Sequence, residues 1–174
     1  MIEIIIFIIV SGGIIWLSWP SFKSPLSHGF PRFFAFESIL ALVLLNLNHW
    51  FQNPFSWHQI ISWICLLASL FLVIHGFYIL RQIGKPSGSF EDTTQLVLVG
   101  AYRYIRHPLY SSLLFLGWGA FWKYPSWMAG ILVAIATFAL ILTAKFEEQE
   151  NIVKFGYQYT QYMKNSKMFI PFIF

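Results

Sequence analysis

Long apolar runs constrain the fold of this chain more than any other feature of its sequence. A helix needs about 20 apolar residues to cross the hydrocarbon of a bilayer. Five segments approach that length, namely residues 3–19, 33–51, 55–80, 108–122 and 126–144. Only 10% of the 174 residues are charged and 57% are hydrophobic, so polar side chains are too few to cover a water-soluble globule of this size. We therefore expect an all-α integral membrane protein with about five transmembrane helices.

The apolar runs fall into two groups, which we expect to form a single membrane domain. Residues 1–54 contain two N-terminal spans, whereas residues 55–174 contain the other three spans and the motifs described below. The first run lacks the basic start and the small-residue cleavage site of a secretory signal peptide. We expect it to remain in the protein as a membrane helix.

The basic residues predict the orientation of the chain in the membrane. All eleven Lys and Arg residues except Lys123 lie in or beside loops that share one side of a five-span protein. Cytoplasmic loops are enriched in Lys and Arg, so we expect the N-terminus outside and the C-terminus in the cytoplasm. The basic residues occur singly rather than in the clusters that bind phosphate backbones, which argues against a nucleic-acid partner.

A basic stretch precedes the fourth apolar run. Pro108 is suited to the first turn of a helix, where its missing N–H group costs nothing. Arg103, Arg106 and His107 add donors beside the positive end of that helix, which together favour binding of a carboxylate or a phosphate. The simpler interpretation is a positively charged membrane anchor with a proline cap.

An acidic stretch follows the fifth apolar run. Glu147, Glu148 and Glu150 stand at the head of a segment in which apolar residues recur at spacings of three and four, at Ile152, Phe155, Tyr159 and Tyr162. This spacing predicts a C-terminal amphipathic helix lying along the membrane interface. The acids either stabilise the N-terminus of that helix or form a cation site opposite the basic stretch. In the second case a ligand with both an ammonium and a carboxylate group would fit between the two stretches, and we expect no metal.

The two stretches together resemble a known family of membrane enzymes. The first follows the pattern L-V-x-x-G-x-Y-x-x-x-R-H-P-x-Y, with Leu96, Val97, Gly100, Tyr102, Arg106, His107, Pro108 and Tyr110. The second supplies Glu147, Glu148, Phe155, Gly156, Tyr159, Tyr162, Ile170 and Pro171. This combination resembles the isoprenylcysteine carboxyl methyltransferases, which are related to phospholipid N-methyltransferases and other small membrane methyltransferases. Two positions depart from the family pattern: Ser112 replaces a common glycine, and Met168 replaces a common basic residue.

The resemblance implies a cofactor, a reaction and a set of site residues. The cofactor would be S-adenosylmethionine, and a methyl group would move to a lipophilic or small acceptor, or to a membrane lipid, at the cytoplasmic face. Arg106, Tyr110 and Glu148 are then the expected catalytic residues. The expected cofactor-binding residues are Gln95, Leu96, Val97, Val99, Gly100, Tyr102, Arg106, His107, Tyr110, Glu147 and Glu148. An acceptor that must lose a proton could use His75, Glu37 or a tyrosine as its base.

Two other functions stay open from the sequence alone. Membrane sterol and enone reductases share a related C-terminal region but bind NADPH, and a non-catalytic membrane protein could keep the same fold. The glycine-rich G-x-G-x-x-G turn of soluble nucleotide-binding folds does not occur in the chain.

Overall fold

The computed structural model describes residues 2–23, 27–85 and 93–173, and these parts of the chain are almost entirely helical. The helices are α1 (Ile2–Ser18), α2 (Gly29–Leu45), α3 (Trp57–Ile83), α4 (Pro108–Lys123), α5 (Trp127–Phe155) and α6 (Tyr157–Asn165), with short 3-10 turns η1 (Trp19–Lys23), η2 (Leu47–His49) and η3 (Gly100–Arg103). The described residues contain no named strand, and their isolated bridge pairs Ile105 with Lys167. The all-α prediction is confirmed.

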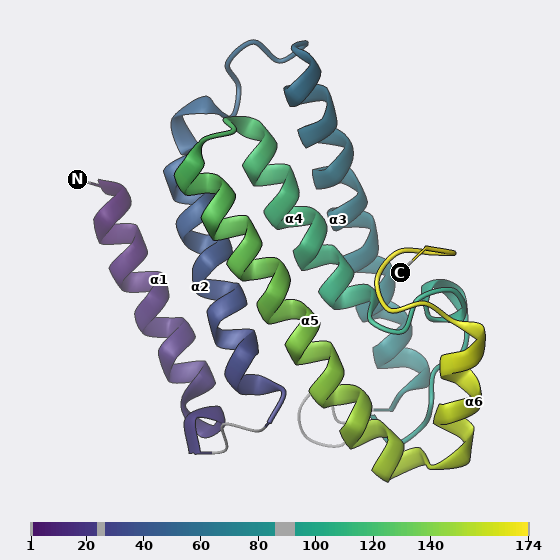
Figure 1. The fold of residues 1–174 in the computed structure, drawn as a ribbon. Coiled ribbons are helices and arrows are strands. Elements are labelled where there is room, and N and C mark those ends of the chain that lie inside the picture. Colours follow the sequence, from purple (N-terminus) through teal and green to yellow (C-terminus); the bar gives the residue numbers. More distant parts are fainter. Residues whose placement is uncertain (1, 24–26, 86–92, 174) are drawn as a thin grey trace.

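The helices α1 to α5 run alternately up and down in one bundle (Figure 1). The α3 helix packs along α4, and α2 packs along α5. The short α6 and the chain that follows it return from the lower end of α5 toward the start of α4 (Figure 1). The C-terminal part of the chain therefore meets the segment that precedes α4.

Three of the helical segments in the described chain are long and apolar enough to cross a membrane: Ile2–Phe22, Trp57–Ile83 and Trp127–Phe155. The α2 and α4 helices, at 17 and 16 residues, are shorter than the usual span. The second predicted span, 33–51, extends too far at its C-terminal end, because α2 stops at Leu45. There the side chain of Asn46 donates a hydrogen bond to the carbonyl of Ala120 on α4, at 2.8 Å, and the chain turns into η2.

The end of α5 differs from the sequence prediction in a way that bears on the site. The helix does not stop near residue 144 but continues to Phe155, so Glu147 and Glu148 lie within α5 rather than at the head of a new helix. It ends at Gly156, whose φ of +58° is a backbone conformation that favours glycine. The predicted apolar stripe is thus split between two helices.

The shorter α6 places the apolar part of that stripe against the protein. Tyr159 is 3% exposed and Tyr162 is 9% exposed. In contrast, Tyr157 is 76% exposed. The buried face of α6 therefore closes over neighbouring parts of the chain instead of facing lipid.

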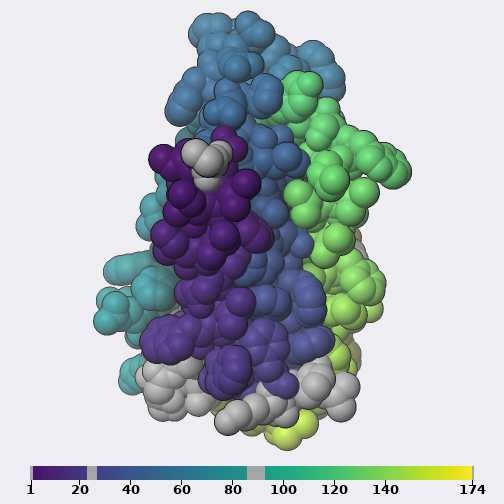
Figure 2. Space-filling model, turned by 90° about the vertical axis from the view of Figure 1, so that its left-hand side faces the viewer, coloured from purple at the N-terminus to yellow at the C-terminus, as the bar shows by residue number. Residues whose placement is uncertain are grey.

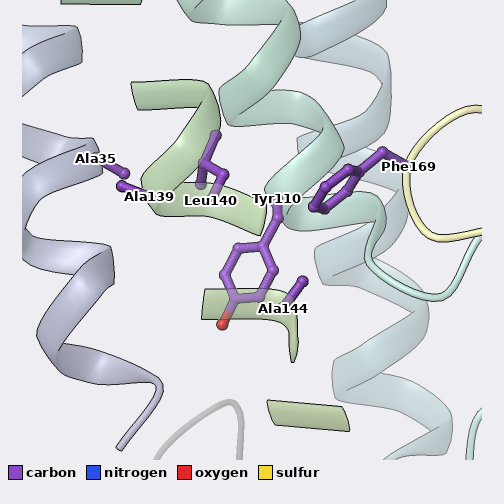
Figure 3. Close-up of a cluster of buried hydrophobic side chains, with 6 residues drawn as sticks. All are labelled: Ala35, Tyr110, Ala139, Leu140, Ala144 and Phe169. Carbon is purple, nitrogen blue, oxygen red and sulfur yellow. The ribbon is translucent and has the colours of Figure 1, made fainter. Parts of the chain in front are cut away.

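Small residues allow the helices at the centre of the bundle to approach closely. Ala35 on α2 meets Ala139 on α5, and the Tyr110 ring projects from α4 toward Ala144 (Figure 3). Phe169, from the chain after α6, completes this cluster. A side chain of the C-terminal segment is thus part of the bundle core.

The α1 helix lies at the edge of the bundle, in front of α2 in the side view of Figure 2. Its buried residues are Ser11 and Ser18, and most of its isoleucines are exposed, as expected for a helix that faces lipid. The Ser11 hydroxyl donates a hydrogen bond to Oε2 of Glu37 on α2, at 2.6 Å. The carboxyl group of Glu37 is therefore engaged with α1.

Candidate active site

A cavity lies at the end of the bundle where α3 ends, α4 begins and α5 meets α6. The space inside it that the centre of a water-sized sphere can reach is about 70 Å³. Its walls are formed by Leu80, Thr93, Leu96, Val97, Tyr102, Arg106, His107, Leu109, Tyr110, Glu147, Asn151, Phe155, Tyr159 and Tyr162. Apolar, aromatic and ionisable side chains thus face one enclosed space.

Gly100 shapes the wall contributed by the segment before α4. It has a φ of +59°, and a Cβ atom built on it would lie 2.1 Å from Cδ1 of Ile79 and 2.8 Å from Nε2 of His75. The turn can therefore press directly against α3. It brings Val97 and Tyr102, on either side of it, into one buried cluster with Ile79.

Arg106 is held by three acceptors behind the cavity wall. Its Nε donates to Oε1 of Glu148 at 2.6 Å, and its Nη1 donates to the carbonyls of Ser166 at 2.5 Å and Met163 at 3.3 Å. Both members of the ion pair are largely buried, with 10% of the arginine side chain and 7% of the glutamate side chain exposed. The pair thus ties the start of α4, the end of α5 and the end of α6 together.

His107 lies between the two glutamates. Its Nε2 is 3.4 Å from Oε1 of Glu148, and its Nδ1 is 3.9 Å from Oε2 of Glu147. His107 is 4% exposed, and its ring stacks on the Tyr110 ring at a centroid distance of 5.5 Å. Packing and electrostatics therefore both fix the orientation of this imidazole.

The chain after α6 is hydrogen-bonded to the segment that leads into α4. The amides of Arg106 and His107 donate to the carbonyls of Lys167 and Met168, at 2.7 and 3.2 Å, and the Ser111 hydroxyl donates to the carbonyl of Phe169 at 2.8 Å. Met168, which replaces a basic residue of the family pattern, thus contributes its backbone here. The two backbone amides before the start of α4 therefore donate to carbonyls of the protein itself.

The other departure from the family pattern, Ser112, fits tightly in its helix. The residue is 3% exposed, and its hydroxyl donates to the carbonyl of Leu109 in the same helix, at 2.6 Å. The polar group that a serine adds in place of glycine is therefore satisfied locally.

Three tyrosines of the wall are neutral hydrogen-bonding groups. Burial raises the pKa of Tyr102, Tyr159 and Tyr162 above the usual range of tyrosine, and nearby glutamate carboxylates raise the pKa of Tyr102 and Tyr159 further. The Tyr162 hydroxyl donates to the carbonyls of Tyr102, at 2.5 Å, and Ile105, at 3.3 Å. It thereby joins α6 to η3.

The residues expected at the site from the sequence occupy three positions. Leu96, Val97, Tyr102, Arg106, His107, Tyr110 and Glu147 line the cavity. Gln95 lines an adjoining cleft, together with Leu96 and Phe155. Val99 and Gly100 are exposed on the turn beside the cavity, and Glu148 lies behind Arg106.

Several wall residues were not expected at the site. Leu80, Thr93, Leu109 and Asn151 line the cavity, as do Phe155, Tyr159 and Tyr162 from the second motif. Asn151 could have been found from its position four residues after Glu147, because residues at that spacing share one helix face.

Of the expected bases, the tyrosines reach the cavity, but Glu37 and His75 do not line it. The described residues include no group of three His, Cys, Asp or Glu that could hold a metal ion.

Comparisons with known proteins support the family resemblance seen in the motifs. The phospholipid methyltransferase family profile matches residues 57–158, more than half of the chain. Relatives include the methanethiol S-methyltransferase of Crocosphaera subtropica, 31% identical over 65% of this chain and 44% of its own length. Methanethiol S-methyltransferase 2 of Bradyrhizobium diazoefficiens is 33% identical over 66% of this chain and 44% of its own length. The methanethiol S-methyltransferase of Pseudomonas deceptionensis is 28% identical over 80% of this chain and 50% of its own length.

The matched region contains most of the cavity described above. It includes α3, η3, α4 and α5, and ends within α6, at residue 158. The chain spans about half the length of the curated relatives it matches. The three helices in the described residues that are long and apolar enough to span a bilayer, together with this match, identify a membrane protein. The chain belongs to the phospholipid methyltransferase family.

Proposed function

We propose that the protein transfers a methyl group from S-adenosylmethionine to a small thiol or a lipophilic acceptor at the cytoplasmic face of the membrane. The observation that carries this proposal is the convergence of the family motifs on one cavity with both carboxylate and imidazole groups, formed by Glu147, His107 and the clustered tyrosines. The named activity of the relatives, methanethiol S-methylation, is a methyl transfer to a thiol.

The chemistry of the cavity fits the proposed cofactor. Its amino-acid part carries an ammonium and a carboxylate, for which the Glu147 carboxylate on one side and the N–H donors of Arg106 and His107 on the other are suitable hydrogen-bonding partners. The aromatic rings of Tyr110 and Tyr159 can favour a positively charged sulfur. Gln95, Leu96, Val97, Val99, Gly100 and Tyr102 would hold the adenosine part. The bound cofactor supplies an electrophilic methyl group on a sulfonium.

The protein's own contribution is positioning and exclusion of water. Transfer of a methyl group from a sulfonium spreads the positive charge onto a neutral acceptor or cancels the negative charge of an anionic one, so a site that excludes water and has fixed groups favours it. Arg106 and Glu148 would keep the walls in place, while Tyr110, which is 6% exposed, would border the path of the methyl group.

A thiol acceptor must also lose its proton when its sulfur takes the methyl group. Burial raises the pKa of Tyr159 and Tyr162, so these tyrosines stay protonated at neutral pH and are not available to accept a proton. Because Glu147 is proposed to hold the ammonium of the cofactor, His107 is the cavity-lining group suited to accept that proton. A lipid amine is the second candidate acceptor, favoured by the family profile that matches the chain.

Binding and transfer can be tested separately on the purified protein in detergent. Calorimetry should detect binding of S-adenosylhomocysteine and no binding of NADPH. His107→Ala should lose the binding, while His58→Ala should keep it, because His58 lies beside Trp122 at the opposite end of α4. If the unmodified protein binds NADPH or neither nucleotide, the methyltransferase proposal is wrong.

The acceptor can then be identified with S-adenosylmethionine that carries a radiolabelled methyl group. We expect label in methanethiol or other small thiols, and less in a total lipid extract. Label found only in the lipid fraction would replace the thiol with a lipid acceptor. No transfer to either fraction, despite cofactor binding, would contradict both acceptor classes.

A further inference from the structure

Two stretches of non-helical chain pair with each other at the cavity end of the bundle. Residues 104–107 lead into α4, and residues 167–173 follow α6. The Lys167 amide donates to the carbonyl of Tyr104 at 2.9 Å, and the Lys167 carbonyl accepts from the amide of Arg106 at 2.7 Å. In Figure 1 the yellow chain after α6 returns to the start of α4, where this pairing forms.

The side chains on these paired stretches are divided between the core and the outside. Ile105 is 2% exposed and Phe169 is 1% exposed. In contrast, Tyr104 is 48% exposed, Phe172 is 81% exposed and Ile173 is 76% exposed. The centroids of the Tyr104 and Phe172 rings lie 6.0 Å apart. These three exposed residues form an outer patch on the side of the pair that faces away from the core.

Phe172 has a backbone conformation that glycine usually provides. Its φ is +67°, and the amide of Ile173 donates to the carbonyl of Ile170 at 3.2 Å, which closes a turn with Pro171 and Phe172 at its centre. A positive φ at the third position of a turn is unfavourable for a bulky side chain. Because the ring is largely exposed, contacts inside the protein offset little of this cost. A contact outside the protein would offset more of it.

Basic side chains border the outer patch. Cζ of Arg103 lies 5.9 Å from the centroid of the Tyr104 ring, and the exposed Lys167 is paired with the same residue through its backbone. Within the part of the chain that the structure describes, neither of these basic groups forms an ion pair with a carboxylate. The surroundings of the patch are therefore positively charged.

The irregular backbone determines how deep the patch can lie in a bilayer. Irregular chain that is exposed to lipid does not occur within the hydrocarbon, because its polar groups would find no partners there. Aromatic rings and basic residues are instead typical of the interface with the headgroups. Basic residues at that level attract anionic lipids.

We propose that the outer patch docks into the headgroup region of a bilayer that contains anionic phospholipids. Phe172 and Ile173 insert between the lipids, while Arg103 and Lys167 contact lipid phosphate groups. The interfacial contact that the sequence predicted for the C-terminal amphipathic helix thus falls to the stretch that follows α6.

Spin labels measure whether the patch is inserted. In a Cys65→Ser background, a nitroxide would be attached to Ile173→Cys or to Gln158→Cys, an exposed position on α6. In nanodiscs of phosphatidylcholine mixed with phosphatidylglycerol, the label at 173 should collide more with oxygen, which dissolves in lipid, than with a water-soluble nickel complex. The label at 158 should show the reverse preference. Adding Phe172→Gly should shift the label at 173 toward the nickel complex, because the inserted ring is removed.

Hydrogen exchange measures the contribution of charge. The Ile173 amide should exchange more slowly in nanodiscs that contain phosphatidylglycerol than in pure phosphatidylcholine, by about fivefold for each basic residue in contact. The double variant Arg103→Gln, Lys167→Gln should lose this difference. Lys154→Gln is the matched control, because it removes an exposed lysine at the end of α5, away from the patch, and it should keep the difference.

Each part of the proposal has a result that contradicts it. If the labels at 173 and 158 both prefer the nickel complex, the patch is not inserted, and its exposed rings would instead suit contact with another protein. Equal exchange of the Ile173 amide in the two lipid mixtures, or an equal loss with Lys154→Gln, would overturn the preference for anionic lipids. None of these outcomes depends on the proposed methyl transfer.

Discussion

Gly100 is the residue at which side-chain size and backbone conformation are most constrained beside the cavity. Its φ is +59°, and an added methyl group would meet Ile79 and His75 on α3. Gly100→Ala should therefore lower the free energy of unfolding by about 1–3 kcal/mol, the usual cost of a strained backbone conformation. Thermal unfolding in detergent measures the loss, and binding of S-adenosylhomocysteine should weaken with it.

Gly130→Ala provides the control for this substitution. Gly130 lies in α5 with nothing within 4 Å of an added Cβ, and its backbone is helical. Alanine is the better helix former, so this variant should be as stable as the unmodified protein or slightly more stable. If Gly100→Ala unfolds at the same temperature as Gly130→Ala, the turn is not constrained as described.

At this scale the sequence predicts which residues lie close together better than it predicts which atoms they contact. The motif spacing identified Arg106, His107, Glu147 and Glu148 as a group, and the fold brings all four within one cluster. The direct bond between Arg106 and Glu148 depends on how α4 crosses α5. At that crossing the Tyr110 ring of α4 packs with the small side chain of Ala144 on α5, a contact that a charge pattern does not reveal.

Among the elements, α6 depends on a few polar contacts for its position against η3. The Tyr162 hydroxyl donates to the carbonyls of Tyr102 and Ile105. Tyr162→Phe leaves these buried acceptors unsatisfied, which should cost about 1–3 kcal/mol. We expect faster hydrogen exchange of the α6 amides, with little change in α3 and α4.

Tyr157→Phe is the matched control, because Tyr157 begins the same helix and is 76% exposed. It should leave the exchange of α6 unchanged. Equal exchange rates in the two variants would mean that α6 is held by its apolar contacts and by Arg106 alone.

The apolar runs predicted the existence of every long helix, because an unbroken run of this kind has no other stable state in a bilayer. Helix ends were less predictable. Glu147 and Glu148 suggested the start of a new helix, yet glutamate is also a good helix former, and the backbone continues through both residues until Gly156. The break is a property of one glycine conformation, which a sequence pattern only hints at.

For the molecule as a whole, polar groups gather at the two ends of the bundle. At the end opposite the cavity, Lys123 is 1% exposed and donates hydrogen bonds to Oε1 of Gln59, at 3.0 Å, and to the carbonyl of Trp50, at 3.2 Å. Its ammonium also lies 3.3 Å from the centroid of the Trp63 ring. Lys123, the one basic residue that the sequence places on the opposite side from the others, is therefore enclosed by neutral and aromatic partners rather than exposed at the membrane surface.

The predicted orientation of the molecule can be measured with single cysteines. Gln52 is exposed in the connection between α2 and α3, and Gln158 is exposed on α6, at the end that carries the cavity. Lys123 is unsuitable as a probe position because it is buried. The native Cys65 is half-buried in α3 and would first be replaced by serine.

Intact expressing cells are then treated with a maleimide that does not cross membranes. Lys145, Lys154, Lys164 and Lys167 are all exposed near the cavity end, and exposed basic residues favour the cytoplasmic side. Gln52→Cys should therefore react in intact cells, and Gln158→Cys only after the membrane is permeabilised. The reverse pattern would place the cavity outside the cell, where intracellular S-adenosylmethionine does not reach it. The same labelling result therefore tests both the predicted orientation and the proposed reaction.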